Sequence, residues 1–342
     1  MKKYRSIDAI RGFFALLIVW HHLCSMMGIP YNMDFGNTIV LFFFVLSGFH
    51  ITITWKDKIQ GHSKEFIIKR CSKIFPIQWL MTLLFVIFGV NIVSIWAIPF
   101  HFTLMQSLLP FWEIYGSANG PSWFLSSLFI CYLFVPIIFK IVNKSNVLFA
   151  TALISSIILF TIFIYILPNA IGRRWLVYIN PFARLIDFSV GVLLGIIWSA
   201  FSNFVMNIPR KTAIFTLFEL VALCGFMVVV SFKPIIALNN YPVIRYPLIL
   251  LLISTFTLSY GIISKLFSNK VLSWLGGISM SIYMVHGFIL HYVNKLYEMP
   301  IWGRVILAYL LVLLISYFVN LALPYMASKF ISAANAICKR FN

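Results

Sequence analysis

The sequence predicts an all-α protein that crosses a membrane many times. Of its 342 residues 62% are hydrophobic and only 10% are charged, and a mean hydropathy of +0.98 excludes a soluble globular domain. Ten stretches are apolar over about the 20 residues that a helix needs to cross a bilayer. No soluble domain interrupts them, so residues 1–342 are expected to form a single transmembrane domain. The predicted spans are 7–27, 35–55, 74–98, 121–143, 147–167, 182–201, 212–232, 244–264, 272–294 and 301–325.

The positions of the cations predict the orientation of these spans. With the amino terminus in the cytoplasm, 18 of the 26 Lys and Arg fall in inside segments, and six fall in outside segments or at their edges. The other two, Arg11 and Arg184, lie within spans. Because an excess of Lys and Arg marks cytoplasmic loops, both termini are expected to be cytoplasmic. The net charge of +18 is therefore attributed to membrane orientation and not to binding of nucleic acid.

The cysteines and the amino terminus exclude other classes of protein. The five cysteines are scattered without a CxxC pair, so neither a disulfide framework nor a metal site is expected. The first span is too long and too polar for a cleavable signal peptide.

The first span carries more ionisable residues than a plain membrane anchor tolerates. A charge near the centre of a spanning helix costs about 2.5–3.5 kcal/mol. Asp8, Arg11 and His22 share one helical face, because eleven residues at about 100° each return to nearly the same direction, whereas His21 points away. That face is expected to meet protein interior or a water-filled cavity. His22 is a candidate general base, with helix packing as the alternative, and the alternative for Arg11 is to extend to the membrane surface or simply to pair with Asp8.

Two segments after the first span have more than one interpretation. Ser47 and Gly48 interrupt an aromatic run in the second span, and packing of helices through small residues is the favoured explanation. The basic connection 56–73 is either a topological anchor or an electrostatic cradle for an anionic ligand or lipid. It ends in KIFP, whose proline is expected to open the third span. The connection 99–120 is expected outside, as an interfacial or re-entrant segment.

Later spans contain pairs of polar residues one helical turn apart. Pro121 is suited to the first turn of the fourth span. Arg184 and Asp187 in the sixth are expected to pair within the membrane, and Tyr283 and His286 lie on one face of the ninth.

These stretches, in this order, resemble the acyltransferase 3 family of bacterial integral-membrane O-acyltransferases. The resemblance covers residues 5–290. It implies that His22 corresponds to the essential histidine of the family and Arg11 to its partner arginine. The matching pieces are Arg11 and His22 with ten residues between them, FFFVLSGF, the basic run ending in KIFP, PSWFLSSLF–YLFVP, RLIDFSVGVLLG and ISMSIYMVH.

The resemblance implies an O-acetyltransferase of the bacterial inner membrane. It would move acetyl from acetyl-CoA, with no permanently bound cofactor, to a hydroxyl of a surface polysaccharide or a lipid-linked glycan precursor. The phosphates of the donor are expected near Arg11 or the basic run, and the pantetheine arm is expected to pass Ser47 towards His22. Asp8 is counted with the catalytic residues. The expected donor-binding residues are Ser47, Lys69, Arg70 and Lys73, and the expected supporting residues are Trp123, Arg184, Asp187, Tyr283 and His286.

Other functions remain open from the sequence. One alternative is transfer of succinyl in place of acetyl, and another is a secondary transporter or flippase of a glycan intermediate. A third is a non-catalytic partner in a polysaccharide export complex. Many family members carry an acidic pair in the fourth span, where this chain has Leu128 and Phe129. This departure argues against a carboxylate role for that helix and indicates a branch with a different acceptor site.

Overall fold

The computed structural model describes residues 4–30, 33, 35–166, 172, 174–231 and 242–340. Within these ranges the chain folds into helices joined by turns, and no strand is present. Eight helices are long and apolar enough to cross a membrane, a bent pair of helices adds a ninth candidate, and one further apolar helix is shorter. These features confirm the prediction of an all-α, multi-pass membrane protein. The cytoplasmic position of both termini stays a prediction.

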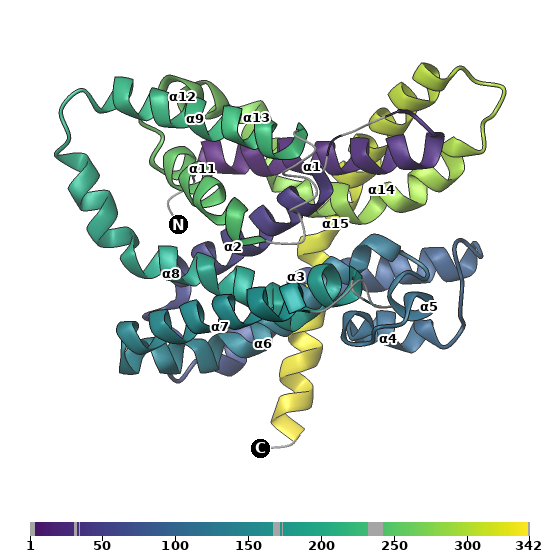
Figure 1. Cartoon of the computed structure of the whole chain (residues 1–342). Helices are drawn as coiled ribbons and strands as arrows, with labels where there is room; N and C mark the ends of the chain where they lie inside the picture. The colour runs from purple at the N-terminus through teal and green to yellow at the C-terminus, as the bar shows by residue number, and fades with distance from the viewer. Residues whose placement is uncertain are drawn as a thin grey trace.

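Figure 1 shows two layers of helices: α1, α9 and α11–α14 form one, and α4–α7 form the other. Within the bundle α1 packs along α13, and α2 packs along α8. The yellow carboxyl-terminal part of α15 extends beyond the two layers (Figure 1). The long helices are α1 (Arg5–Met27), α2 (Phe35–Trp55), α3 (Ser63–Ile87), α6 (Trp123–Lys144), α7 (Asn146–Ile166), α8 (Pro181–Met206), α9 (Lys211–Ser231) and α15 (Ile301–Arg340). The shorter elements are α4 (Ala97–Thr103), η1 (Gln106–Leu108), α5 (Trp112–Tyr115), η2 (Gly120–Ser122), the π-helix η3 (Trp175–Ile179), η5 (Pro242–Arg245), α11 (Tyr246–Leu258), α12 (Ile262–Phe267), α13 (Lys270–Gly277) and α14 (Ser279–Asn294).

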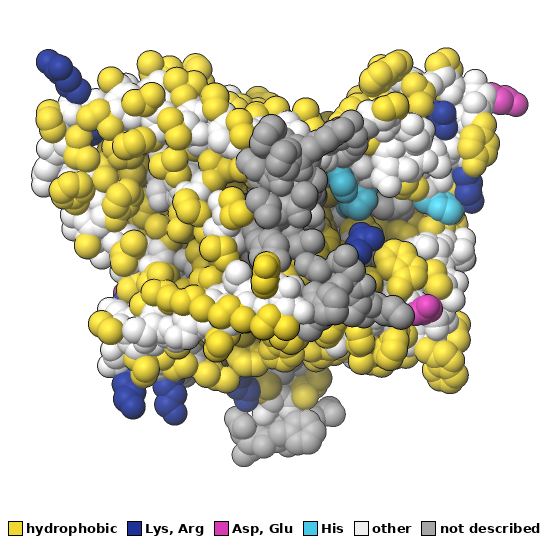
Figure 2. All heavy atoms as spheres, in the orientation of Figure 1, with side chains coloured by type: hydrophobic (Ala, Val, Ile, Leu, Met, Phe, Trp, Pro, Cys, Tyr) yellow, Lys and Arg dark blue, Asp and Glu magenta, His cyan; other side chains and the backbone are white. Residues whose placement is uncertain are grey.

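The outer surface of the bundle is apolar, as contact with lipid requires. Hydrophobic side chains cover most of the face in Figure 2, and Lys and Arg side chains lie mainly toward its margins. Leu159 and Ile166 of α7 and Phe204 of α8 are among the large apolar side chains left exposed by the fold. Exposed apolar area of this extent is expected of a protein whose solvent is the bilayer.

The third span begins earlier than predicted. Helix α3 starts at Ser63, so most of the basic connection is helical, and Pro76 lies inside the helix and does not open it. The stretch before Pro76 contains no glycine or other proline, and Lys69 Nζ contacts Glu65 Oε1 at 2.5 Å across one helical turn. Such i,i+4 pairs favour helix. The helix also ends early, at Ile87, and the predicted end at 98 is wrong.

Two predicted spans are interrupted. Helix α11 ends at Leu258, the next residue Ser259 has a φ of 56°, and α12 starts at Ile262. The break is satisfied from another helix, because the buried Glu219 of α9 accepts hydrogen bonds from the backbone N–H of Ile263 (3.0 Å) and Ser264 (3.3 Å). Helices α13 and α14 meet at a bend of 63°. The last helix, by contrast, continues past the predicted end at 325 to Arg340.

Glycines allow two helix pairs to approach closely. A Cβ at Gly48 of α2 would overlap the carbonyl of Phe188 of α8, and a Cβ at Gly191 would overlap the carbonyl of Val45. Packing through small residues therefore explains Gly48, as predicted. A Cβ at Gly276 would overlap the backbone of Asp8, so α13 contacts the first turn of α1 directly. This contact places the α13–α14 bend beside the polar end of α1.

The connection between α3 and α6 folds into a compact cap of four short helices, α4, η1, α5 and η2. Gln78 of α3 donates to the carbonyl of His101 (3.1 Å), and Gln106 donates to Ser122 Oγ (3.1 Å). His101 Nε2 lies 3.0 Å from the carbonyl of Ile114. Burial of this imidazole lowers the pKa of His101 from 6.5 to about 4. The cap is thus tied to α3 through Gln78, and to α6 through Ser126, whose hydroxyl donates to the carbonyl of Leu104 at 2.7 Å.

Candidate active site

A cavity of about 500 Å³ opens among α1, α2, α3, α6 and α14; we call it the first cavity. It brings together residues that are more than 200 positions apart in the sequence. The predicted catalytic residues Asp8 and Arg11 line it, and so do three of the four predicted donor-binding residues. The polar and charged side chains of its wall are Tyr4, Asp8, Arg11, Ser47, His50, Arg70, Lys73, Tyr132, Ser279 and Tyr283.

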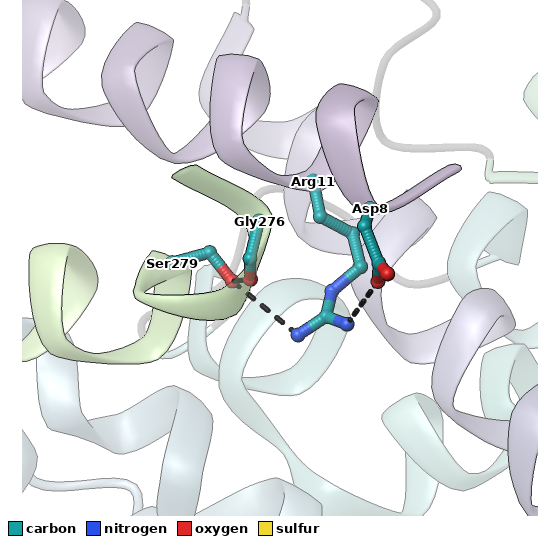
Figure 3. A network of polar contacts seen from close by, with 4 residues as sticks. All are labelled: Asp8, Arg11, Gly276 and Ser279. Carbon is teal, nitrogen blue, oxygen red and sulfur yellow. Dashed lines mark hydrogen bonds and ion pairs between the residues drawn. The ribbon is translucent and has the colours of Figure 1, made fainter. Parts of the chain in front are cut away.

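Arg11 joins α1 to the bend between α13 and α14. Its Nη1 donates to Asp8 Oδ1 at 3.0 Å, and its Nη2 donates to Ser279 Oγ at 3.4 Å. Ser279 Oγ in turn donates to the carbonyl of Gly276 at 2.9 Å. Figure 3 shows the guanidinium reaching from α1 to a point between Asp8 and Ser279. The side chain of Arg11 is 35% exposed, so the fixed guanidinium still faces the cavity.

The cations of α3 separate into two groups. Arg70 and Lys73 line the first cavity, and the Arg70 guanidinium lies 5.5 Å from the ring centre of Phe66 and 5.6 Å from that of Tyr132. Contacts of this kind hold a guanidinium against aromatic faces without neutralising it. Arg70 and Lys73 therefore leave the cavity wall with uncompensated positive charge.

Lys69 is placed outside the first cavity. It pairs with Glu65, and it lines a second cavity of about 790 Å³ between the end of α2 and the start of α3. Tyr4 and His50 line both cavities, so the second cavity adjoins the first. The predicted grouping of Lys69 with Arg70 and Lys73 is thus replaced by two adjoining basic cavities.

Ser47 lies in the wall of the first cavity, as predicted, and its hydroxyl donates to the carbonyl of Phe43 at 2.7 Å. The sequence analysis missed His50, which lines the same wall one helical turn after Ser47. The spacing of three residues between them was the available signal, since residues three apart share a helical face. Tyr132 was missed as well, although it lies four residues after Leu128 on the wall formed by α6.

His22 does not line the first cavity. Its ring centre lies 5.0 Å from that of His286 and 5.3 Å from that of His21. His21 faces Gly36 of α2, so the two adjacent histidines point in different directions, as helical geometry predicts. The prediction that Asp8, Arg11 and His22 share one face holds for α1, but only the first two reach this cavity.

Three aromatic rings of the cavity wall contact one another, and one of them also contacts His286. Tyr283 lines the cavity, and its ring centre lies 5.6 Å from that of His286. Its hydroxyl donates to the carbonyl of Pro121 at 2.8 Å. Phe124 lies 5.2 Å from Tyr283 and 6.1 Å from Phe43, and all three rings belong to the cavity wall. We call these three rings the aromatic partition; of them, Tyr283 contacts His286, the neighbour of His22.

The remaining predicted supporting residues lie away from the cavity wall. Arg184 Nη1 contacts Asp187 Oδ2 at 2.9 Å, and both side chains are at most 4% exposed. Asp187 accepts a hydrogen bond from Tyr246 of α11 at 2.6 Å. The pair thus joins α8 to α11, and neither of its residues lines the first cavity. Trp123 is buried and packs on Tyr178 of η3, with ring centres 4.7 Å apart.

A family model for an acyltransferase domain, Acyl_transf_3, matches residues 4–326. The chain belongs to the acyltransferase 3 family. The match confirms the resemblance inferred from the sequence motifs, over nearly the whole chain.

Similar proteins agree with this family membership. Acyltransferase MdmB of Streptomyces mycarofaciens is 30% identical over 160 residues, 41% of this chain and 40% of its own length. Peptidoglycan O-acetyltransferase OatA of Listeria monocytogenes is 24% identical over 320 residues, 82% of this chain and 48% of its own length. Putative acetyltransferase ORF330 of Acidianus two-tailed virus is 24% identical over 197 residues, 56% of this chain and 57% of its own length. The chain thus spans about half the length of these relatives. No solved structure matches the chain.

Within this acyltransferase 3 chain, α6 departs from the acidic family pattern in a structurally defined way. Leu128 occupies the wall of the first cavity where the pattern would place a carboxylate. Phe129 packs edge-on against Phe75, with ring centres 5.1 Å apart. Asp8 is consequently the one carboxylate among the described residues that line the first cavity.

Proposed function

We propose that this protein is a membrane-embedded O-acetyltransferase that moves acetyl from acetyl-CoA to a hydroxyl of a bacterial surface polysaccharide or its lipid-linked precursor. The observation that carries the proposal is the first cavity, whose cationic wall includes Tyr283, the neighbour of the histidine pair His22 and His286. The name of the Listeria relative, a peptidoglycan O-acetyltransferase, supports a glycan as the acceptor. The predicted location is the bacterial inner membrane, with the basic cavities open to the cytoplasm.

The two basic cavities suit a long, anionic acyl donor. Arg11, Arg70 and Lys73 supply positive charge in the first cavity, and Lys56 and Lys58 line the second, where Lys69 is paired with Glu65. A donor that carries phosphates at one end and a thioester at the other is held by its charged end and extends its slim arm inwards. Because the cavities adjoin at Tyr4 and His50, the phosphates and the arm are accommodated in one continuous path. Guanidinium groups are well suited to phosphate oxygens.

The chemistry assigned to the site is direct transfer. His22 takes the proton of the acceptor hydroxyl, the hydroxyl oxygen attacks the thioester carbonyl, and the carbon–sulfur bond breaks. The proton held by His22 then passes to the thiolate, so the products are the acyl ester and free CoA thiol. The partition of Phe43, Phe124 and Tyr283 has to open for the thioester to reach His22. No step requires a covalent acyl-enzyme.

Acyl transfer by the purified protein in lipid nanodiscs tests the proposal. Radiolabelled acetyl-CoA is supplied with lipid-linked glycan, and release of CoA thiol and labelling of the glycan are both measured. We expect both signals from the wild type and neither from His22→Ala at matched abundance. Mass spectrometry of surface glycans from deletion and complemented strains identifies the acyl group, which separates acetyl from succinyl. Unchanged acylation of the glycans on deletion, without CoA release in vitro, would favour a transporter or an export partner.

A further inference from the structure

His286 is a fully buried histidine with one nitrogen left free for a partner. It lies in the middle of α14 with no exposed surface, and its Nδ1 is 2.5 Å from the carbonyl oxygen of Tyr283. A carbonyl only accepts hydrogen bonds, so Nδ1 carries the proton and Nε2 carries a lone pair. That Nε2 has no hydrogen-bond partner in the part of the chain that the structure describes. A buried acceptor without a donor is unfavourable and calls for an explanation.

The nearest ring that can supply the donor is His22. Two imidazoles joined by an N–H···N hydrogen bond of about 2.9 Å, each with its nitrogen about 1.1 Å from the ring centre, have centres about 5 Å apart. The observed separation of the His22 and His286 ring centres is 5.0 Å, with 35° between the ring planes. The spacing fits one such hydrogen bond, which the two rings do not make in the orientation that the structure describes. The histidines come from α1 and α14, which pack against each other.

We propose that His286 positions His22 for catalysis by accepting its N–H. The inference rests on the proposed function and assigns a role to a second residue of that site. With one His22 nitrogen donating to His286 Nε2, the other His22 nitrogen is left as a lone pair directed at the acceptor hydroxyl. When His22 takes the hydroxyl proton it becomes an imidazolium, and the bond to His286 becomes charge-assisted and stronger. The proton later leaves His22 for the CoA thiolate, while His286 keeps its own proton on Nδ1 throughout.

None of the three other described groups considered next, His21, Tyr283 and Arg174, replaces His286 as the acceptor. The ring of His21 lies edge-on to His22 at 75° and faces Gly36 on α2. Tyr283 already donates its hydroxyl proton to Pro121. Arg174, just before η3, is close enough to act electrostatically on His22, but a guanidinium has no lone pair with which to accept an N–H. His286 is therefore the neighbour that fixes which nitrogen of His22 is protonated.

Two substitutions at position 286 separate positioning from packing. His286→Phe keeps a ring but removes the acceptor, and His286→Gln keeps an oxygen acceptor near the place of Nε2. We expect His286→Phe to lower kcat about 10- to 100-fold, a part of the 10²–10⁴-fold that a positioned base contributes, with the KM for acetyl-CoA within about twofold of wild type. We expect His286→Gln to recover most of the lost kcat. His291→Gln, on the same helix, is the matched control and should retain wild-type rates.

The pH dependence of kcat/KM is a second test, in addition to the size of kcat. The pH at which kcat/KM falls on the acid side reports the protonation of His22 in the free enzyme, and it should shift in His286→Phe but not in His286→Gln. A wild-type kcat in His286→Phe would overturn the proposal, and so would equal losses in the Phe and Gln variants when both melt at the wild-type temperature. Failure of the proposed function is distinct, because the wild-type protein would then transfer no acetyl group at all.

Discussion

Exchanging the cations of α3 for glutamine, one at a time, tests whether the first cavity binds the phosphates of the donor. Arg70 and Lys73 line that cavity, whereas Lys69 lies outside it and pairs with Glu65. The three residues lie within little more than one turn of the same helix, so the variants form a matched set. We expect Arg70→Gln and Lys73→Gln to raise the apparent KM for acetyl-CoA, and Lys69→Gln to change it little.

The expected size follows from the charges. Two opposite unit charges about 6 Å apart interact by about 2.8 kcal/mol at an effective dielectric constant of about 20. The mouth of the cavity is open to water, which we take to reduce this interaction energy to about half, or about 1.4 kcal/mol. Loss of one cavity cation is therefore expected to raise the KM for acetyl-CoA about tenfold. Lys69 is 52% exposed and already paired, and exposed pairs contribute little. Its replacement is expected to change KM less than about threefold.

The assay measures initial rates in nanodiscs as a function of acetyl-CoA concentration, at several salt concentrations. It tests whether the first cavity binds the phosphates of the donor. The Debye length falls from about 30 Å at 0.01 M to about 8 Å at 0.15 M. The KM effects of Arg70→Gln and Lys73→Gln should therefore be larger at low salt. An effect of Lys69→Gln equal to theirs, or effects that do not depend on salt, would refute the assignment of the phosphates to the first cavity.

Three further predictions test other parts of the molecule. His22→Ala should lower turnover by about 10²–10⁴-fold at matched membrane abundance. His21→Ala should lower turnover much less, because the His21 ring packs on α2. An essential His21 with a dispensable His22 would reverse the catalytic assignment. Reporter fusions should place the 99–120 connection outside and the carboxyl terminus in the cytoplasm, and a common side for both would contradict the charge-based topology. Because burial lowers the pKa of His101 from 6.5 to about 4, the unfolded cap binds more protons than the folded one between these values. The cap should therefore lose stability as the pH falls from 6.5 towards 4. The measurement is amide hydrogen exchange at residues 97–103, corrected for intrinsic rates, which should become faster. Exchange that does not change with pH would show that His101 is not the titrating group.

The parts of the fold that depend on local patterns could be predicted from the sequence. Hydropathy over about 20 residues located the apolar helices, because every spanning helix must present an apolar surface to lipid. The helical period gave the Asp8–Arg11 contact and the different directions of His21 and His22. It also gave the buried pair of Arg184 and Asp187, which lie one turn apart. Each of these features follows from residues that are neighbours along the chain.

The features that the sequence did not reveal depend on contacts between distant segments. The break after α11 is stabilised by Glu219 of α9, which lies more than 40 residues earlier. The bend between α13 and α14 carries Gly276 against the first turn of α1, a contact that no local pattern indicates. Lys69 is an exception with a local cause, because it pairs with Glu65 across one turn of α3 and does not line the cavity that Lys73 enters. The helical period shows which residues share a face of a helix, but not which other helix packs against that face.

Position 128 is a leucine and not the carboxylate of the family pattern, which affects both the binding of the acyl donor and the assignment of the catalytic base. An acidic side chain at this point of the wall would face the positive charge of Arg11, Arg70 and Lys73 and would reduce the attraction for phosphates. With leucine there, Asp8 is the carboxylate that the described wall retains, and it is already bonded to Arg11. The cavity wall also carries His50, but the proposed function assigns the base to His22, whose ring centre lies 5.0 Å from that of His286.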